Sequence, residues 1–367
     1  MSDTAQQEPP QKLVMPTTKN PVRLAQCMAG AAQGGAELFF ERLVQGLAFY
    51  PTLQQRAFLR PDPQQRLTML RNVHVACEEH RFPGPAQPWA TWRYRRALKS
   101  FQPDVVLTWM SRASSATPRG DYTLVNRLGH YYDLKYYQHA DYWIGISKGI
   151  CDYLVQNGMP AERVIHLPNF ADETTPRRHT RNAYGTPPGS PLLFSAGRLH
   201  PNKGFDVLLQ ALVELPEATL WLAGDGPEAK SLKKLSEDLG VASRVVFLGW
   251  RTDVTALMAI ADVFVCPSRH EGLGSIVLES WAHGCAVAAT ASQGPSELIE
   301  HGVTGMLSPV DDPTALAGII TDLLSNPQAR ATIVANAAAE YKEKYSRDVV
   351  LQQYHDVFCE LAAKRRG

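Results

Sequence analysis

Short apolar strands alternate with helices along this chain, and glycines stand where several of the strands end. The clearest example begins with an apolar run from Val22 to Met28, which enters the loop Ala-Gly-Ala-Ala-Gln-Gly-Gly at 29–35. A helix is predicted next, from Ala36 to Phe49, because its apolar residues recur at helical spacing. A strand, a glycine loop and a helix open a Rossmann-type unit. Such alternation favours parallel sheets covered by helices on both faces.

The first glycine loop leaves two interpretations open. Its glycines stand at 30, 34 and 35, so it matches neither G-x-G-x-x-G nor a Walker P-loop. It can be a tight turn without a ligand, or a loop in which Gly34 and Gly35 let backbone amides approach a phosphate. No clear ribose-binding acid follows about twenty residues later, which argues against a dinucleotide oxidoreductase.

The length of the chain predicts two domains. Its 367 residues exceed what one hydrophobic core usually serves. A second series of strands and helices starts at Leu192, after a polar stretch without periodicity. We predict a flexible leader at 1–20, a first Rossmann-like domain at 21–172, a linker at 173–190, a second Rossmann-like domain at 191–345, and a C-terminal helix at 346–367 that packs back on the first domain.

Charge is distributed unevenly although the net charge is only +1. Residues 1–180 carry 21 basic and 15 acidic side chains, and residues 181–367 carry 16 and 21. The net charge gives no reason to expect binding to nucleic acid, but the basic first half could face phosphates or an anionic membrane. The stretch Trp92–Lys99 is basic, aromatic and helical in pattern. It is either a solvated helix face or a patch that contacts anionic lipid through Arg93, Arg95, Arg96 and Lys99.

The cysteines and the N-terminus indicate a cytoplasmic protein. Six cysteines are scattered without a C-x-x-C motif, which favours free thiols in a reducing compartment. The first residues lack a signal sequence, and no apolar run approaches the length of a membrane span. Peripheral association with the inner membrane face stays open.

The stretch from Pro267 to Glu279 pairs two carboxylates. Glu271 stands in a glycine-rich loop after an apolar strand, and Glu279 follows eight residues later, in the first turn or two of a predicted helix whose N-terminus lies between the two glutamates. The helical stretch Glu279–His283 stops at Gly284. The N-terminus of a helix offers unpaired N–H groups and a positive dipole end, which suits an anionic ligand.

Another strand ends at Gly197, and two basic residues follow it. Ligands of doubly wound sheets bind at the carboxyl ends of the strands. Arg198 could grip a diphosphate with its bidentate fork, and Lys203 could add a compact charge. Weaker signals stand at two later strand ends. Gly224 belongs to a glycine pair around an acid that is more often a turn than a site, and Trp250 could meet a nucleobase or simply pack.

These motifs resemble a known family in their order and spacing. Gly197-Arg198 with Lys203-Gly204, Gly224-Asp225-Gly226-Pro227, and Glu271 through Glu279 look like the retaining family 4 of the GT-B glycosyltransferases, the glycosyl transferases group 1. The specific motifs cover residues 190–310, and over 22–170 only the glycine loop and the architecture match. Two glutamates separated by seven residues are the signature of that family. The resemblance implies an α/β GT-B fold: two Rossmann-like doubly wound domains facing across a cleft, the first for the acceptor and the second for the donor, with a C-terminal helix returning to the first.

The resemblance also implies roles for single residues. Arg198 and Lys203 would bind the diphosphate of a nucleotide sugar, Glu279 the ribose hydroxyls and Glu271 the hydroxyls of the sugar. His130 would touch the transferred sugar. The implied catalytic residues are Arg198, Lys203, Glu271 and His130. The implied donor-binding residues are Gly34, Gly35, Gly197, Arg198, Lys203, Gly224, Trp250, Arg251, Glu271, Gly274, Ser275, Ile276 and Glu279.

The predicted function is transfer of a sugar, with retention, from a UDP- or GDP-linked donor to a glycan or lipid-linked acceptor, such as an intermediate of lipopolysaccharide or exopolysaccharide synthesis. Preplaced cations and helix N-termini can stabilise a leaving diphosphate, and no Asp-x-Asp or His/Cys ligand spacing is present, so we expect neither metal nor cofactor. Retention through front-face attack and through a covalent intermediate both stay open. The alternative is a non-catalytic nucleotide-sugar-binding protein of the same fold, which would be expected to lack a charged donor residue.

Overall fold

The computed structural model describes residues 20–30, 34–61, 66–82, 87–175 and 179–366. Contacts divide the chain into two compact units. The first unit takes in the chain as far as Arg127, residues 133–143 and the chain from Leu351 onward, and the second takes in residues 128–132 and 144–350. The predicted leader lies outside the described residues except for Asn20, and so does the 176–178 part of the predicted linker.

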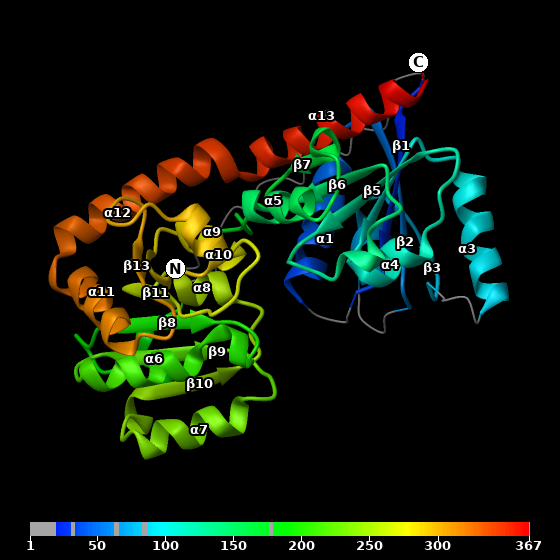
Figure 1. The fold of residues 1–367 in the computed structure, drawn as a ribbon. Coiled ribbons are helices and arrows are strands. Elements are labelled where there is room, and N and C mark those ends of the chain that lie inside the picture. The colour runs from blue at the N-terminus through cyan, green and yellow to red at the C-terminus, as the bar shows by residue number, and fades with distance from the viewer. Residues whose placement is uncertain (1–19, 31–33, 62–65, 83–86, 176–178, 367) are drawn as a thin grey trace, which may run out of the picture. The chain divides into compact units, whose positions relative to one another are not determined.

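A seven-stranded sheet is built around β1, in the order β3-β2-β1-β4-β5-β6-β7 (Figure 1). β1 pairs in parallel with β2 and with β4, β2 with β3, and β4 with β5. β4 and β5 are buried along their whole length, as strands covered on both faces must be. The strands are β1 (Val22–Met28), β2 (Leu53–Leu59), β3 (Ala76–Glu79), β4 (Val105–Trp109), β5 (Thr123–Leu128), β6 (Tyr142–Gly145) and β7 (Val164–His166). The accompanying helices are α1 (Gly35–Leu47), α2 (Arg66–Asn72), α3 (Pro88–Phe101), α4 (Met110–Ala116) and α5 (Lys148–Gln156).

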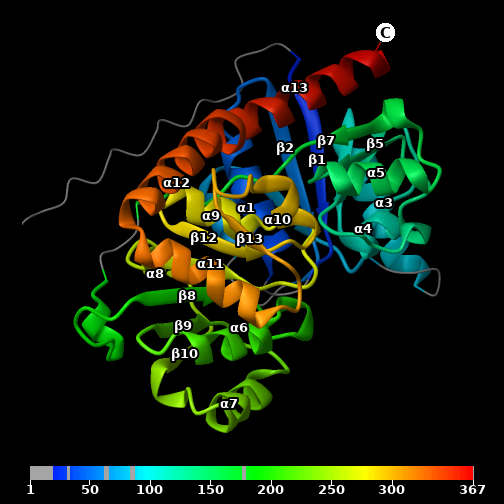
Figure 2. The ribbon, with the colours of Figure 1, turned by 60° about the vertical axis from the view of Figure 1, so that its left-hand side comes forward.

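A six-stranded parallel sheet forms the centre of the second unit, in the order β10-β9-β8-β11-β12-β13. Its core includes α6 and α11, which lie side by side (Figure 2). Fully buried side chains of both helices, such as Leu208 and Ile320, belong to this core. The strands are β8 (Leu192–Ala196), β9 (Thr219–Ala223), β10 (Val245–Gly249), β11 (Val263–Cys266), β12 (Ala286–Thr290) and β13 (Met306–Ser308). The helices are α6 (Phe205–Ala211), α7 (Ala229–Asp238), α8 (Val254–Met258), α9 (Ser275–Ala282), α10 (Gln293–Leu298), α11 (Pro313–Ser325) and α12 (Pro327–Glu340).

Both sheets follow the Rossmann strand order, which confirms the predicted pair of doubly wound sheets. In each, the chain winds outward from a central strand to one edge and then returns to continue on the other side. The reversal lies between β1 and β4 in one sheet and between β8 and β11 in the other. At such a switch point the two loops that leave the strands diverge and form a ligand crevice. In the second unit these loops are 197–204 and 267–274.

Helix α9 begins at Ser275, so its N-terminus lies between Glu271 and Glu279, as predicted, and the predicted helical stretch from Glu279 forms its second half. Gly274 takes a left-handed conformation, with φ of 78°, and thereby turns the chain into the helix. Burial of Val277 and Leu278 against the core outweighs the modest helix propensity of this stretch. Glu279 therefore lies in the second turn, four residues after Ser275 and on the same side of the helix.

The C-terminal helix α13 (Arg347–Arg366) makes its last contacts within the first unit. Arg127 donates from Nε to the hydroxyl of Tyr354 at 3.0 Å, and Arg366 pairs with Asp104 at 2.6 Å. Gly46 of α1 leaves no space for a β-carbon beside Leu351. Side chains from the two ends of the sequence thus belong to one folding unit.

Candidate functional site

An ion pair joins the two loops at the switch point of the second sheet. Lys203 stands six residues after Gly197, at the end of the short 3-10 turn Pro201–Lys203, and its Nζ contacts Oε1 of Glu271. Ser268 donates its hydroxyl to the same carboxylate oxygen at 2.9 Å. Burial alone would lower the pKa of Lys203, but the charge of Glu271 and the hydrogen bond to it together outweigh burial and raise that pKa. The ammonium of Lys203 is therefore charged at neutral pH.

Glycines let the backbones beneath this pair approach each other closely. Gly204 has a left-handed φ of 62°, and a β-carbon there would collide with the carbonyl of Pro267. A β-carbon on Gly224 would collide in the same way with the carbonyl of Gly197. The amide of Gly197 donates to Ala223 at 3.0 Å, which joins the ends of β8 and β9. Two predicted donor residues, Gly197 and Gly224, are thus in contact, and their role here is to bring strand ends together.

Arg269 braces the two loops from the side. Its guanidinium donates to both carboxylate oxygens of Asp206, at 2.8 and 2.7 Å, and to the carbonyl of Pro201 at 2.7 Å. A second carboxylate, that of Asp311, lies 2.5 Å away. The pairing with Asp206 raises the pKa of Arg269, and although burial alone would raise the pKa of Asp206, its bonds to Arg269 lower it. Arg269 was not among the residues predicted from the sequence.

His130 lies next to the Glu271 loop, within the same unit. A β-carbon on Gly272 would touch the backbone of Gly129 and the Cα of His130, so these two loops pack backbone to backbone. The amide of Tyr131 donates to Nδ1 of His130 at 2.8 Å, which leaves the proton of the neutral ring on Nε2. Burial lowers the pKa of His130, with the charge of Glu271 opposing it. The imidazole is therefore neutral at pH 7 and donates through Nε2.

Glu297 on α10 holds the segment behind His130 in place. Its carboxylate accepts the amides of Lys148 at 2.6 Å and Gly149 at 3.0 Å, the first two residues of α5. A β-carbon on Gly149 would collide with the hydroxyl of Tyr131, so Tyr131 is packed against this helix start. Glu297 is a second supporting residue that the sequence analysis missed.

Glu279 is buried on α9, with 8% of its surface exposed. Its Oε2 accepts the amide of Asp172 at 3.0 Å, and the carbonyl of Asp172 bonds to Nε2 of His283 at 2.6 Å. Near the start of α9, Asn169 donates from Nδ2 to the hydroxyl of Ser275 at 2.7 Å. Residues 169–172 thus lie along the helix and fix the position of the Glu279 carboxylate.

The other predicted site residues fall into three groups. Gly274 caps α9, so the amides of Ser275 and Ile276 open its first turn, where the macrodipole favours an anion. Arg198 and Trp250 are exposed, Trp250 by 46%, so Trp250 is not a core residue.

Arg251 and the first glycine loop already have contacts within the protein, which argues less for a contact with the donor. The Arg251 guanidinium is occupied by Asp253, through two bonds of 2.8 and 2.6 Å, and by the hydroxyl of Tyr184. Gly34 and Gly35 belong to the first unit, at the start of α1. There the side chain of Glu37 fills the space where β-carbons on Gly30 and Gly34 would stand.

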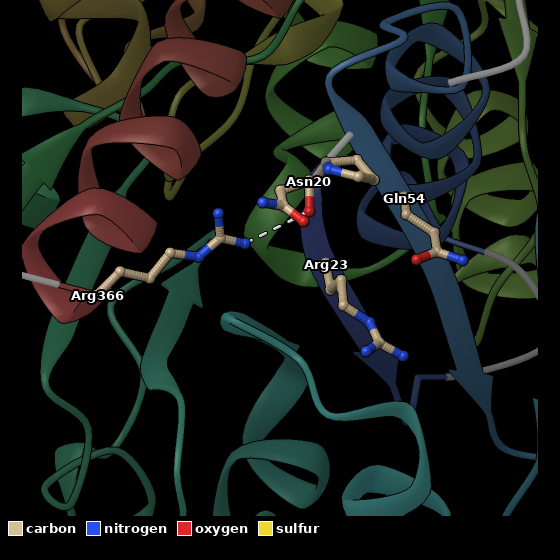
Figure 3. A pocket seen from close by; sticks show the side chains of 5 residues that line it. Asn20, Arg23, Gln54 and Arg366 are labelled. Atoms are coloured by element: carbon tan, nitrogen blue, oxygen red, sulfur yellow. Dashed lines mark hydrogen bonds between the residues drawn. The ribbon is translucent and has the colours of Figure 1, made fainter. Parts of the chain in front are cut away.

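Three further observations concern the described part of the chain. It contains no group of three or more His, Cys, Asp or Glu side chains placed to hold a metal ion. None of its helices is long and apolar enough to cross a membrane. A cavity of about 440 Å³ lies at the amino end of β1, where Arg23 and Arg366 approach from opposite sides (Figure 3). Because it is at the amino end of the strand, it lies at the opposite end of the first sheet from the switch point between β1 and β4.

Similar proteins have been characterised. The family model of the glycosyl transferases group 1 matches residues 176–340. The lipopolysaccharide core biosynthesis glycosyltransferase LpsE of Rhizobium meliloti is 32% identical over 88% of this chain and 94% of its own length, and LpsD of the same organism is 30% identical over 91% and 97%. Among solved structures, Anabaena HepE in complex with UDP and glucose has a TM-score of 0.78 at 24% identity, covering 91% of this chain and 99% of HepE. WaaG, a glycosyltransferase involved in lipopolysaccharide biosynthesis, has a TM-score of 0.69 at 19% identity, covering 91% and 99%.

Proposed function

Because this chain belongs to the group 1 glycosyltransferases and has the GT-B fold, we propose that it transfers a sugar with retention, and without a metal, from a UDP- or GDP-linked donor. The observation that carries the proposal is the Lys203–Glu271 pair beside His130 at the switch point of the second sheet. A ligand bound there meets a cation, a carboxylate and a neutral imidazole donor at once.

Charge on the leaving group decides the roles of the basic residues. Breaking the glycosyl–phosphate bond leaves a negative charge on the departing diphosphate. Lys203 is partly buried, charged and already held in place by Glu271, so it needs little reorganisation to stabilise that charge. Arg198, exposed at the end of β8, supplies the second cation, and the first turn of α9 adds amide donors. These groups provide the stabilisation that a divalent cation would otherwise give, so we expect full activity in the presence of a chelator.

Polar groups on either side of the cation position the donor. Glu271, held by Ser268 and Lys203, accepts hydrogen bonds from hydroxyls of the sugar. His130 donates from Nε2 to a further sugar oxygen. Glu279 accepts the ribose hydroxyls from its fixed place on α9. Orientation by several such groups converts binding energy into rate, because the reacting centre is held in its productive geometry.

The names of the relatives support a proposal for the acceptor. LpsE and LpsD are named for lipopolysaccharide core biosynthesis, and WaaB is a lipopolysaccharide outer core galactosyltransferase. We therefore propose a lipopolysaccharide core intermediate as the acceptor, at the cytoplasmic face of the inner membrane. The non-catalytic alternative is disfavoured because Arg198, Lys203, Glu271 and Glu279 are all present.

Two measurements test the proposal. A thermal-shift panel of UDP, GDP, ADP, TDP and CMP should show one favoured diphosphate, because a ligand that binds only the folded state raises the unfolding temperature. Incubation of the matching nucleotide sugar with core oligosaccharide should give a product whose anomeric configuration, read by NMR, is that of the donor. An inverted product, or turnover that a chelator abolishes, would refute the proposed chemistry.

A further inference from the structure

We propose that helix α3 lies on an anionic lipid bilayer through an exposed aromatic and basic face. This inference deepens the proposed function, since it rests on an acceptor that is anchored in the membrane. It concerns a surface of the first unit that takes no part in the donor site described above.

The helix has two opposite faces. Tyr94, Leu98 and Phe101 are buried in the first unit. At 100° per residue, the opposite side carries the residues spaced i, i+3, i+4, i+7 and i+10. We call this the α3 outer face, and it consists of Trp89, Trp92, Arg93, Arg96 and Lys99, which are all exposed.

Two indole rings project from this face. Trp89 is 74% exposed and Trp92 is 48% exposed, although both are among the largest apolar side chains. Their rings meet edge to face at 5.2 Å, and the guanidinium of Arg96 lies 5.1 Å from the Trp92 ring centre. The two rings therefore pack against each other although neither is buried in the core. Exposed tryptophans grouped in this way mark interaction surfaces, and tryptophan is enriched where membrane and water meet.

Charge identifies the partner as an anionic surface. Within α3 there is no acidic residue, and the α3 outer face contributes three positive charges. Basic residues at a membrane surface are attracted by anionic headgroups while tryptophan rings enter the interface between headgroups and acyl chains. Helix α7 offers a contrast, because its exposed Lys230, Lys233 and Lys234 are followed by Glu237 and Asp238 and include no tryptophan. The combination of indoles and cations thus distinguishes α3 from a merely basic helix.

The test is sedimentation of the full-length protein with vesicles at low salt. Vesicles of phosphatidylcholine with one-third phosphatidylglycerol are compared with vesicles of phosphatidylcholine alone. We expect binding only to the anionic vesicles, lost at high salt. Arg93→Glu/Lys99→Glu should weaken it more than tenfold, since two attractions become repulsions. Trp89→Ser/Trp92→Ser should also weaken it, and should remove the blue shift of tryptophan fluorescence on binding.

A matched control separates this face from the net charge of the protein. Lys230→Glu/Lys234→Glu changes the charge by the same amount on α7, where we expect binding at the wild-type level. Absence of binding to anionic vesicles, or an equal loss in both charge-reversal variants, would overturn the proposal.

Turnover of the nucleotide sugar with a water-soluble core oligosaccharide is measured on the same preparations. It should be unchanged in Arg93→Glu/Lys99→Glu. Normal turnover without vesicle binding would refute the membrane surface alone, and vesicle binding without turnover by the wild type would refute the proposed function alone.

Discussion

Replacing Lys203 by alanine is the sharpest perturbation of the proposed site. Lys203 is the partner of Glu271 and the proposed cation for the leaving diphosphate, so Lys203→Ala removes both interactions at once. With side-chain exposures of 29% for Lys203 and 13% for Glu271, the pair lies between a surface pair and a buried one. We expect a loss of stability of about 1–3 kcal/mol, between the values typical of those two extremes.

The effect on rate should be larger than the effect on folding. Removing one group that stabilises a developing negative charge typically lowers kcat by about 10²–10³-fold. The assay is release of the nucleotide diphosphate at saturating donor, with the unfolding temperature measured on the same sample. Lys230→Ala, which removes an exposed lysine of α7, is the control and should change neither quantity. A stable Lys203→Ala protein with near-wild-type kcat would refute the assignment of Lys203 to the leaving group.

Four further outcomes are expected. Gly204→Ala should lower the unfolding temperature, because a β-carbon there meets the carbonyl of Pro267 in a left-handed backbone, whereas Gly318→Ala in α11, where a β-carbon meets nothing within 4 Å, should raise it. His130 has a lowered pKa, so kcat/KM should fall only as the pH drops below the ordinary histidine range, and His130→Gln should remove this acidic limb. Glu279→Ala should raise the KM for the donor more than tenfold with a smaller change in kcat, and an unchanged KM would argue against ribose binding. Glu297→Gln should lower kcat more than it lowers the unfolding temperature, because one of two amide bonds at the start of α5 is lost and the support of Tyr131 and His130 loosens; a loss in stability alone would leave Glu297 a purely structural residue.

The residues at strand ends were predictable from the sequence because parallel topology gathers them. Gly197 follows β8 and Glu271 follows β11, and the strand order places β8 beside β11. Two apolar runs, one ended by Gly197 and the other followed by the loop that holds Glu271, therefore predict that Lys203 and Glu271 lie near each other. The ion pair between Lys203 and Glu271 agrees with that inference.

Long-range supports were not predictable in the same way. Arg269 reaches Asp206 across 63 residues, and Glu297 reaches the amide of Lys148 across 149. No periodicity or local motif relates such residues, since their meeting depends on how α6, α10 and α5 pack. The strand β2 was also missed, because its Leu-Gln-Gln-Arg beginning does not alternate as a half-buried strand would.

Arg251 shows a signal that was available in the sequence. Asp253 stands two residues later and binds the guanidinium of Arg251 in a bidentate pair. The sequence therefore already offered Asp253 as an alternative partner to a nucleotide. The exact first residue of α9 was not predictable from propensity. Ile276 and Val277 favour a strand by propensity, and burial together with the turn at Gly274 overrides that preference.

Release of a nucleotide diphosphate from its sugar donor tests the central claim most directly. The wild type is incubated with UDP-linked and GDP-linked sugars, with and without core oligosaccharide, and the free diphosphate is measured over time. We predict release from one donor, accelerated by the acceptor and reduced about 10²–10³-fold in Lys203→Ala. Tight binding of a nucleotide diphosphate without release from any of its sugar donors, with or without the acceptor, would contradict the account and indicate a non-catalytic nucleotide-sugar-binding protein.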